Sequence, residues 1–312
     1  MTNPVSPRAV DGRLADMVGG AIELAETWVS LAHQCGAPTI PTSRCAYDGA
    51  HMPAEVERPA HVSRAIATDA VIYVAAATQQ LRALAHLAGP EIVLTGWTVT
   101  RTVAEHCGRV AWLLDPAITP NARLARWYME QIVGIQMARL SLDQKRQRAN
   151  INQIKANRDS LVSQARRVFP DLAVFTTDAL NHWSVGGESY ASLSAAVNRL
   201  GHERLNSKRL YDVLSTYTHP SLYRLHTQTR SEQNEDHIRQ VFIADPEIVR
   251  WQFAIACACV QQAAHYVGSY LALDTTSLET WADHHPLLTS WTLDALRTGE
   301  DPPGSPTDPQ QP

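Results

Sequence analysis

Helical periodicity along almost the whole 312-residue chain is the feature that most limits its fold. Apolar residues recur at the spacing of one helix face, and the strict alternation of a half-buried strand is nearly absent. With 45% hydrophobic residues, the chain can bury a large core. The sequence therefore predicts an all-α protein, a bundle of about seven to nine helices in a single domain over residues 9–297.

Proline, glycine and capping residues set the expected helix ends. Residues 1–8 are expected to be a flexible N-terminus, and the composition of 298–312 predicts a disordered tail. Four prolines in 36–60 predict a long loop, and 169–188 is expected to be another. We expect helices over 9–34, 62–88, 98–115, about 120–168, 189–200, 208–219, 245–273, 276–284 and 287–297, with a polar stretch before the helix at 245.

The expected helix at about 120–168 is long and only partly apolar. Thr119 is a candidate N-cap, with Pro120 at the first helical position. Unbroken, this helix would span roughly 70 Å, so a bend or break near 140–150 is expected. Its second half has a heptad-like spacing that suits a helical hairpin or a homodimer contact. The positions in this seam are Gln147, Ile151, Ile154, Arg158, Leu161, Ala165 and Val168.

The same long helix is basic, although the chain has a net charge of −4. Residues 139–167 hold eight basic and two acidic side chains, a local excess of six positive charges. This excess fits contact with RNA phosphates or an acidic partner, although a solvated helix face is the commoner explanation. The contact candidates are Arg139, Lys145, Arg146, Arg148 and Lys155.

A polar stripe marks the otherwise apolar helix expected at 98–115. At 100° per residue, Arg101, Glu105, Arg109 and Trp112 share one face. Charges on a helix this apolar are either partnered in a core or used in a site. The simplest role for Arg101 and Glu105 is an ion pair within the helix. The opposite face consists of Val103, Cys107, Val110 and Leu114.

Arg101 and His106 also form an Arg-x4-His pattern within this helix. The pattern resembles the signature of the HEPN (higher eukaryotes and prokaryotes nucleotide-binding) superfamily, which includes many metal-independent ribonucleases. By that resemblance, the histidine helps deprotonate a ribose 2′-hydroxyl, and the arginine stabilises charge building on the phosphate. Chance alone predicts about three such pairs in this chain, and only this one lies inside an expected helix.

A second constellation lies about a hundred residues later. Tyr211, Ser215 and His219 recur every four residues, and Pro220 places His219 at a helix C-terminus. A helix C-terminus favours a protonated ring, which suits a phosphate-binding or acid role. Ordinary capping by the histidine and a core role for the tyrosine are the alternative interpretation.

Taken together in chain order, these motifs are more specific. An R-x3-E helix at Arg101, the HWSVGG turn at 182–187 and the Y-x3-S-x3-H helix at Tyr211 follow one another. Over residues 65–220, this order resembles a family of helical bacterial proteins of unknown function with a signature arginine, a family that is itself similar to the HEPN superfamily. By that resemblance, Arg101 and Glu105 are expected to share a polar pocket with Tyr211, Ser215 and His219.

The sequence thus predicts a HEPN-like protein: a metal-independent ribonuclease or an RNA- or nucleotide-binding effector in stress or phage defence. Arg101 would bind phosphate, Glu105 would orient it, and His106 or His219 would transfer the proton. The alternative is a non-catalytic interaction or regulatory protein with a structural Arg–Glu cluster.

Neither function needs a cofactor or a metal. Glu-x-x-His, His-Glu-x-x-His and zinc-ligand spacings are all missing. Five cysteines without a Cys-x-x-Cys motif favour a reducing cytoplasm. The apolar stretch at 251–273 is interrupted by glutamines and a histidine, so a buried helix is expected there and no membrane partner.

Overall fold

The computed structural model describes residues 7–88, 94–141, 148–172, 183–205, 207–219, 225–226, 229–234, 237–242 and 246–289. Within these ranges it contains eleven helices and two short antiparallel hairpins. The all-α prediction is therefore confirmed, with slightly more helices than expected. No helix in the described ranges is long and apolar enough to span a membrane.

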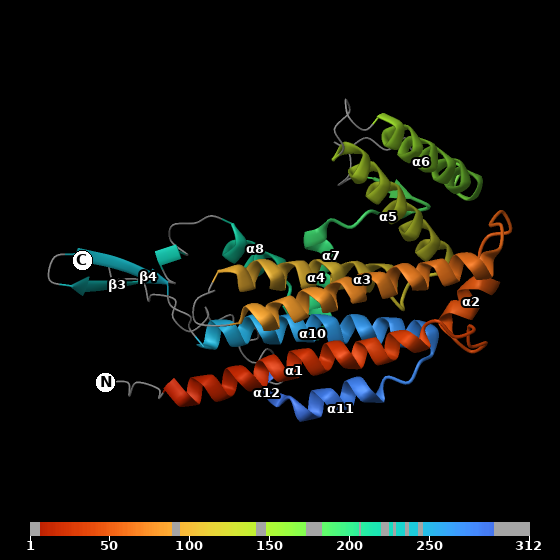
Figure 1. The fold of residues 1–312 in the computed structure, drawn as a ribbon. Helices are drawn as coiled ribbons and strands as arrows, with labels where there is room; N and C mark the ends of the chain where they lie inside the picture. The colour runs from red at the N-terminus through yellow and green to blue at the C-terminus, as the bar shows by residue number, and fades with distance from the viewer. Residues whose placement is uncertain are drawn as a thin grey trace.

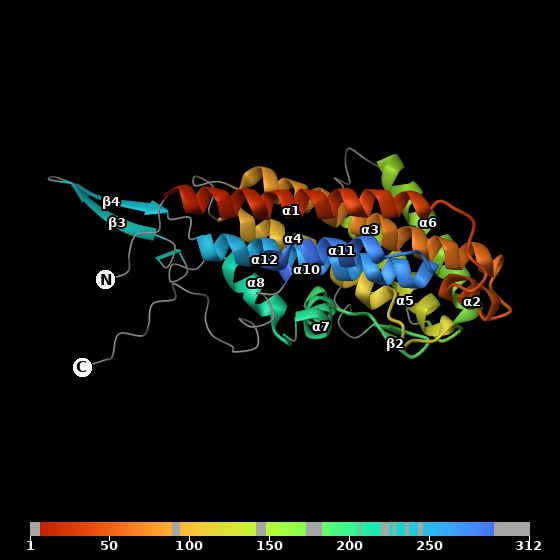
Figure 2. The ribbon, with the colours of Figure 1, turned by 90° about the horizontal axis from the view of Figure 1, so that it is seen from below.

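Four long helices lie side by side and form the bundle (Figures 1 and 2). They are α1 (Pro7–Gln34), α3 (Pro59–Leu87), α4 (Thr95–Leu113) and α10 (Pro246–Leu271). Helix α4 packs against α3 and α10 on its apolar face, and its other side meets shorter helices. The helix that carries the polar stripe is therefore central to the bundle.

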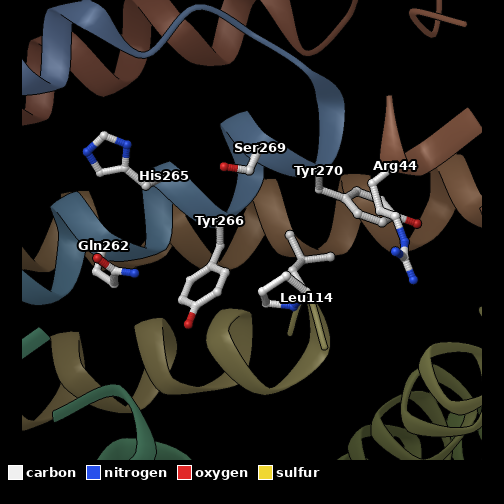
Figure 3. Close-up of a pocket in the computed structure, with 8 residues that line it drawn as sticks. Arg44, Leu114, Gln262, His265, Tyr266, Ser269 and Tyr270 are labelled. Atoms are coloured by element: carbon white, nitrogen blue, oxygen red, sulfur yellow. The ribbon is translucent and has the colours of Figure 1, made fainter. Parts of the chain in front are cut away.

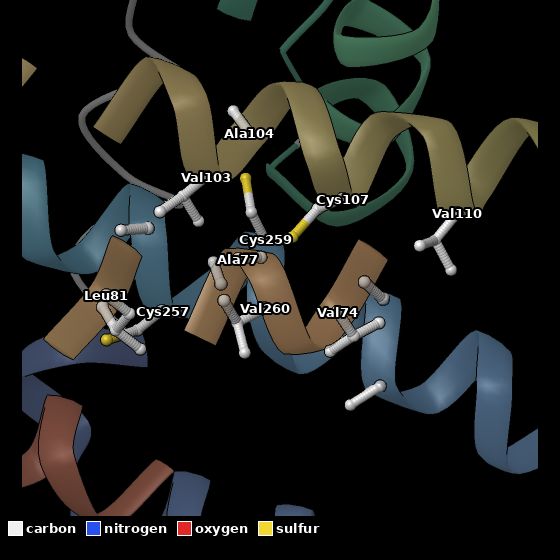
Figure 4. Packing of buried hydrophobic residues seen from close by; sticks show 14 of the residues in the cluster. Val74, Ala77, Leu81, Val103, Ala104, Cys107, Val110, Cys257, Cys259 and Val260 are labelled. Atoms are coloured by element: carbon white, nitrogen blue, oxygen red, sulfur yellow. The ribbon is translucent and has the colours of Figure 1, made fainter. Parts of the chain in front are cut away.

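The apolar face predicted for α4 forms part of the core. Val103, Cys107 and Val110 are fully buried, and they face α3 and α10 (Figure 4). Cys257 and Cys259 of α10 are also buried, and both are free thiols. Burial raises the pKa of the Cys107 and Cys257 thiols, so these groups stay neutral and pack as small apolar side chains.

Shorter helices cover the bundle on two sides. Helices α7 (Leu193–Leu205) and α8 (Leu210–Thr218) pack on α4, whereas α11 (Thr276–His284) packs on α1 and α12 (Pro286–Thr289) packs mainly on α10. Buried Trp281 of α11 donates its Nε1–H to the carbonyl of Gly20 at 2.8 Å. This hydrogen bond satisfies the indole and holds α11 against α1.

The long helix expected at about 120–168 is two helices, α5 (Pro120–Leu140) and α6 (Arg148–Val168). Thr119 is the N-cap of α5, and its Oγ1 accepts from Ala122 N at 3.2 Å. The seam predicted on α6 faces α5: Ala165 is fully buried, and Arg158 Nη1 donates to Gln136 Oε1 at 3.1 Å. The predicted break and hairpin are therefore confirmed, and the seam packs against α5 of the same chain.

Two local expectations were wrong. The region 36–60 holds a helix, α2 (Arg44–Ala50), whose N-cap Ser43 accepts from Ala46 N at 3.1 Å, and α3 already begins at Pro59. Ser189 does not cap α7, because Ser192 Oγ accepts from Ala195 N at 3.1 Å. The termini expected at 1–8 and 298–312 lie mostly outside the described residues, and α1 begins at Pro7.

The end of the loop expected at 169–188 contains a hairpin of two very short strands, β1 (Ser184–Val185) and β2 (Glu188–Ser189). Gly186 and Gly187 make its turn with φ of +57° and +82°. Such backbone angles are readily adopted by glycine and match the turns that close two-residue hairpins.

The polar stretch before α10 also pairs as strands. Strand β3 (Thr229–Asn234) runs antiparallel to β4 (His237–Phe242), with Thr229 opposite Phe242 and Asn234 opposite His237. This hairpin projects from the end of the bundle (Figure 1). Its residues lack the alternation of apolar and polar side chains that is typical of a half-buried strand. The sequence pattern therefore did not predict the hairpin.

Candidate functional site

Helix α8 is fixed over the first half of α4. Asn198 Oδ1 of α7 accepts from the backbone N–H of Tyr211 at 2.7 Å and so satisfies one of the first N–H groups of α8. Leu210 and Leu214 of α8 are fully buried. Near its other end, the ring of Tyr217 stacks on Trp97 of α4, with centroids 4.3 Å apart.

Arg101 donates hydrogen bonds from three of its nitrogens, one within α4 and two to α8. Its Nε donates to Glu105 Oε1 at 2.8 Å, its Nη2 to Tyr211 Oη at 2.5 Å, and its Nη1 to Thr218 Oγ1 at 2.9 Å. The Thr218 hydroxyl in turn donates to the carbonyl of Leu214 at 3.0 Å. We call Arg101, Glu105, Tyr211 and Thr218 the Arg101 cluster.

The Arg101 cluster holds its arginine charged. Burial lowers the pKa of Arg101, but the hydrogen bond and charge of Glu105 and the contact with Tyr211 together raise that pKa above its ordinary value. The side chains of Arg101 and Glu105 remain 21% and 22% exposed. A guanidinium has five N–H groups, and among the described residues two of those of Arg101 make no hydrogen bond.

Ser215 and His219 lie on α8 beside the cluster. Ser215 is half-buried, and His219 is exposed at the helix C-terminus, where its backbone N–H donates to the carbonyl of Ser215 at 3.0 Å. His219 directly follows Thr218, which binds Arg101. Among the described residues, neither Ser215 nor His219 makes a hydrogen bond to Arg101. The structure thus brings together Arg101, Glu105 and Tyr211 as expected and places the other two nearby.

His106 lies apart from the Arg101 cluster. Its side chain leaves α4 about 140° around the helix from Arg101, and its ring lies 6.0 Å from the ring of Tyr73 of α3. Burial lowers the pKa of His106, and the nearby charge of Glu105 only partly opposes this effect. His106 is thus packed toward α3, and no hydrogen bond in the described part of the chain joins it to Arg101.

A second polar cluster, of which the sequence revealed only Arg109, lies between α3, α4 and α5. Arg109 Nη1 donates to the carbonyl of Ala191 at 2.7 Å and lies 3.5 Å from Glu130 Oε2. Tyr73 donates to Glu130 Oε1 at 2.5 Å, and Arg109 packs over the ring of Tyr190. Burial, followed by the charge of Glu130, raises the pKa of both phenols, so they remain neutral donors.

A third cluster fixes α5 to the bundle. Arg123 is fully buried, and its Nε donates to Asp48 Oδ2 at 2.6 Å. The same carboxylate accepts from Arg44 Nε at 2.8 Å and from the Tyr270 hydroxyl at 3.1 Å. We call Asp48, Arg44, Arg123 and Tyr270 the Asp48 cluster. Sequence reasoning missed it because α2 was expected to be loop.

The basic contact candidates are only partly described. Lys155 is exposed on α6, and Arg139 Nε donates to Gln136 Oε1 at 3.2 Å. Arg148 begins α6, and Lys145 and Arg146 lie outside the described residues. Among the residues that the structure describes, no group of three or more His, Cys, Asp or Glu side chains is placed to hold a metal ion.

Comparison of the chain with models of protein families, with curated proteins and with solved structures finds no match in any of the three.

Proposed function

We propose that the protein binds RNA through the Arg101 cluster and cleaves it without a metal, as a HEPN-like ribonuclease. The observation that supports this most is the position of Arg101, a charged and partly exposed arginine whose partner Thr218 adjoins exposed His219. Two N–H groups of Arg101 remain for the non-bridging oxygens of a phosphate, a geometry that arginine suits well.

In this proposal, His219 transfers the proton. Its imidazole takes the proton of a ribose 2′-hydroxyl while that oxygen attacks the adjacent phosphorus. The bond from phosphorus to the 5′-oxygen breaks, and the imidazolium gives its proton to that leaving oxygen. The products are a 2′,3′-cyclic phosphate and a 5′-hydroxyl, so no metal, cofactor or water is consumed. Arg101 stabilises the charge that builds on the phosphate, and Glu105 holds Arg101 in place.

The remaining features have supporting roles in the proposal. Tyr211 and Thr218 fix the guanidinium in one orientation, which lowers the cost of binding an anion. The exposed face of α6, with Lys155, adds positive charge that attracts the RNA backbone. The proposal also includes a role for this activity in stress or phage defence in the cytoplasm.

The test is RNA cleavage by the purified chain with EDTA present. We expect the wild type to cleave single-stranded RNA to products with cyclic phosphate ends and to leave DNA of the same sequence intact. His219→Ala should lose at least about a hundredfold in rate, since general acid–base catalysis contributes that much. His202→Ala, an exposed histidine of α7, is the matched control and should keep the wild-type rate.

Expression in a bacterial host, with and without phage challenge, extends the same test. Growth arrest together with RNA fragmentation in the wild type, and neither effect in His219→Ala, is the expected result. A wild type that neither arrests growth nor cleaves RNA would contradict the ribonuclease proposal. A fully active His219→Ala would contradict the role of His219.

A second candidate function is a non-catalytic interaction or regulatory protein. The observation that favours it is that two of the three side-chain hydrogen bonds of Arg101 join α4 to α8 and the third lies within α4, as in a structural cluster. In that case Arg101→Ala should lower the melting temperature and reduce function only in proportion. His219→Ala should then change neither property, because the ring of His219 is exposed.

A further inference from the structure

A cavity lies along α10, at the opposite end of α4 from the Arg101 cluster (Figure 3). Its volume is about 310 Å³, at the lower end of the range for small-molecule sites. Leu114, which lines it, is 13 residues beyond Arg101, or roughly 20 Å along a helical axis. The cavity is therefore separate from the site proposed for RNA.

Two tyrosine rings and two apolar side chains form most of its wall. Tyr266 and Tyr270 of α10 line the cavity together with Leu114 and Pro116. The hydroxyls of both tyrosines are engaged elsewhere, that of Tyr266 with Glu203 and that of Tyr270 with Asp48. Burial raises the pKa of both phenols, so they add no negative charge. These walls suit a ligand with a flat, apolar ring.

The polar groups stand mainly at one end and along one side. Arg44 of α2 reaches in at one end, and Gln262, His265 and Ser269 of α10 lie along the side (Figure 3). Arg44 uses its Nε for Asp48 and its Nη2 for the carbonyl of Ile118 at 2.8 Å. In the described part of the chain its Nη1 makes no hydrogen bond, and the side chain is 34% exposed.

The charges around the cavity leave this end positive. Arg44 and Arg123 share the single carboxylate of Asp48, so two guanidinium groups face one negative charge. At the other end, Glu203 is paired with Arg199 at 3.0 Å and also accepts from Tyr266. Asp115, between the lining residues Leu114 and Pro116, is paired with Arg199 and Arg126. The local excess of positive charge is therefore the pair of guanidinium groups at Asp48, at the end where Arg44 is open to the cavity.

We propose that this cavity binds a small organic anion, an aromatic carboxylate or phosphate monoester. The anionic group bonds to Nη1 of Arg44, and the hydroxyl of Ser269 at the cavity mouth is a second polar contact. The ring of the ligand packs between the tyrosine rings and Leu114. The guanidinium is the recognition element because its planar set of N–H donors favours carboxylate and phosphate oxygens.

Calorimetric titration of the purified chain tests the proposal with three probes. Phenyl phosphate and benzoate carry the two possible anionic groups, and benzyl alcohol is their neutral analogue. We expect saturable binding of at least one anion, with benzyl alcohol bound at least about tenfold more weakly, since hydrogen bonds to charged groups are the stronger ones. The stronger of the two anions identifies the preferred group.

Two variants locate the binding. Arg44→Gln removes the charge and should weaken binding of the anion about tenfold or more. Ser269→Phe fills the mouth without touching the Asp48 cluster and should abolish binding while circular dichroism and melting temperature stay close to wild type. Ser163→Phe, at an exposed serine of α6, is the matched control and should bind as wild type does.

Three results would overturn the proposal. The first is no binding of either anion by the wild type. The second is binding that Ser269→Phe leaves unchanged, which would place the ligand elsewhere. The third is equal affinity for benzyl alcohol, which would mean that the charge of Arg44 plays no part.

Discussion

Arg123 is the residue whose burial the fold must compensate most fully, because its guanidinium is wholly inside the protein. Asp48 supplies the opposite charge, and the carbonyls of Leu113 and Asp115 accept its Nη1 and Nη2 groups at 2.8 and 3.0 Å. The ring of Tyr270 covers the guanidinium at 5.0 Å. A buried charge with such partners is costly to disturb, since its removal leaves the partners unsatisfied.

Replacing Arg123 with Met should therefore destabilise the protein strongly. The variant removes one donor from Asp48 and both donors from the two backbone carbonyls. We expect the free energy of unfolding in urea to fall by about 3–5 kcal/mol. Arg209→Met is the matched control, because that side chain is 82% exposed and pairs only at the surface with Asp212; its effect should stay within about 0.5 kcal/mol. If Arg123→Met lowered the free energy of unfolding no more than Arg209→Met does, the Asp48 cluster would contribute little to stability.

The contacts of some single residues can be predicted from the sequence, and those of others cannot. Arg101 and Glu105 could be predicted as a pair because helical spacing places them on one face, and the bond between them follows from that spacing alone. Thr218, seven residues after Tyr211 and thus on the same face, could have been found by the same rule. Asp48 and Arg123 could not, because they are 75 residues apart and only tertiary packing joins them.

Among the elements, α4 has a close backbone neighbour in α7. At Gly108, an added Cβ would lie 3.0 Å from backbone atoms of Ala196 and Val197 in α7. Backbone atoms cannot rotate away, so α7 itself would have to move. Since Asn198 of α7 also satisfies the first turn of α8, this movement would reach the Arg101 cluster. At Gly134 of α5, by contrast, an added Cβ would meet nothing within 4 Å.

The two glycines therefore predict opposite effects of the same substitution. Gly134→Ala should raise the free energy of unfolding by roughly 0.5–1 kcal/mol, because alanine loses less backbone entropy in a helix. Gly108→Ala has the same entropic benefit, but its methyl group overpacks the contact between α4 and α7. We therefore expect the free energy of unfolding to fall by about 1 kcal/mol or more. Denaturant unfolding of both variants measures the difference. A stabilised Gly108→Ala would mean that α4 and α7 have room for an added methyl group at this position.

Most elements could be predicted from the sequence, and the failures share a physical cause. The helices α1, α3, α4 and α10 carry long periodic patterns, and the capping by Thr119 was visible as a short motif. Helix α2 is short and surrounded by prolines, so its periodicity covered too few residues to detect. Strands β3 and β4 pair through their backbones without an apolar face, and backbone pairing leaves no periodic signal.

The whole molecule has two hydrophobic clusters of unequal size. The larger one fills the bundle between α1, α3, α4 and α10. The smaller one joins α5, α6 and the β1–β2 hairpin, and it includes Tyr128, Met129, Ala165 and Trp183. Helix α6 packs mainly on α5, on the side away from the bundle (Figure 1). An element held by a single neighbour loses fewer contacts when it opens than a central helix does.

Composition and periodicity were enough to predict the bundle, but not this division of its core. The heptad-like seam of α6 suited either a hairpin or a second copy of the chain, because the same apolar stripe serves both. The structure assigns the seam to α5, with Ala165 fully buried in it and Arg158 bonded to Gln136. That choice depends on the break between α5 and α6, whose position the pattern placed only within about ten residues.

The division predicts that α6 opens without unfolding of the bundle. In native-state hydrogen exchange, amides of 148–168 should show a lower opening free energy than those of α4 and α10. Ala165→Gly, which weakens α6 by about 1 kcal/mol, should speed exchange in α6 roughly fivefold and leave α10 unchanged. If α6 and α10 instead lost protection together, the two clusters would form one cooperative unit, and α5 would transmit the stability of the bundle to its outermost helix.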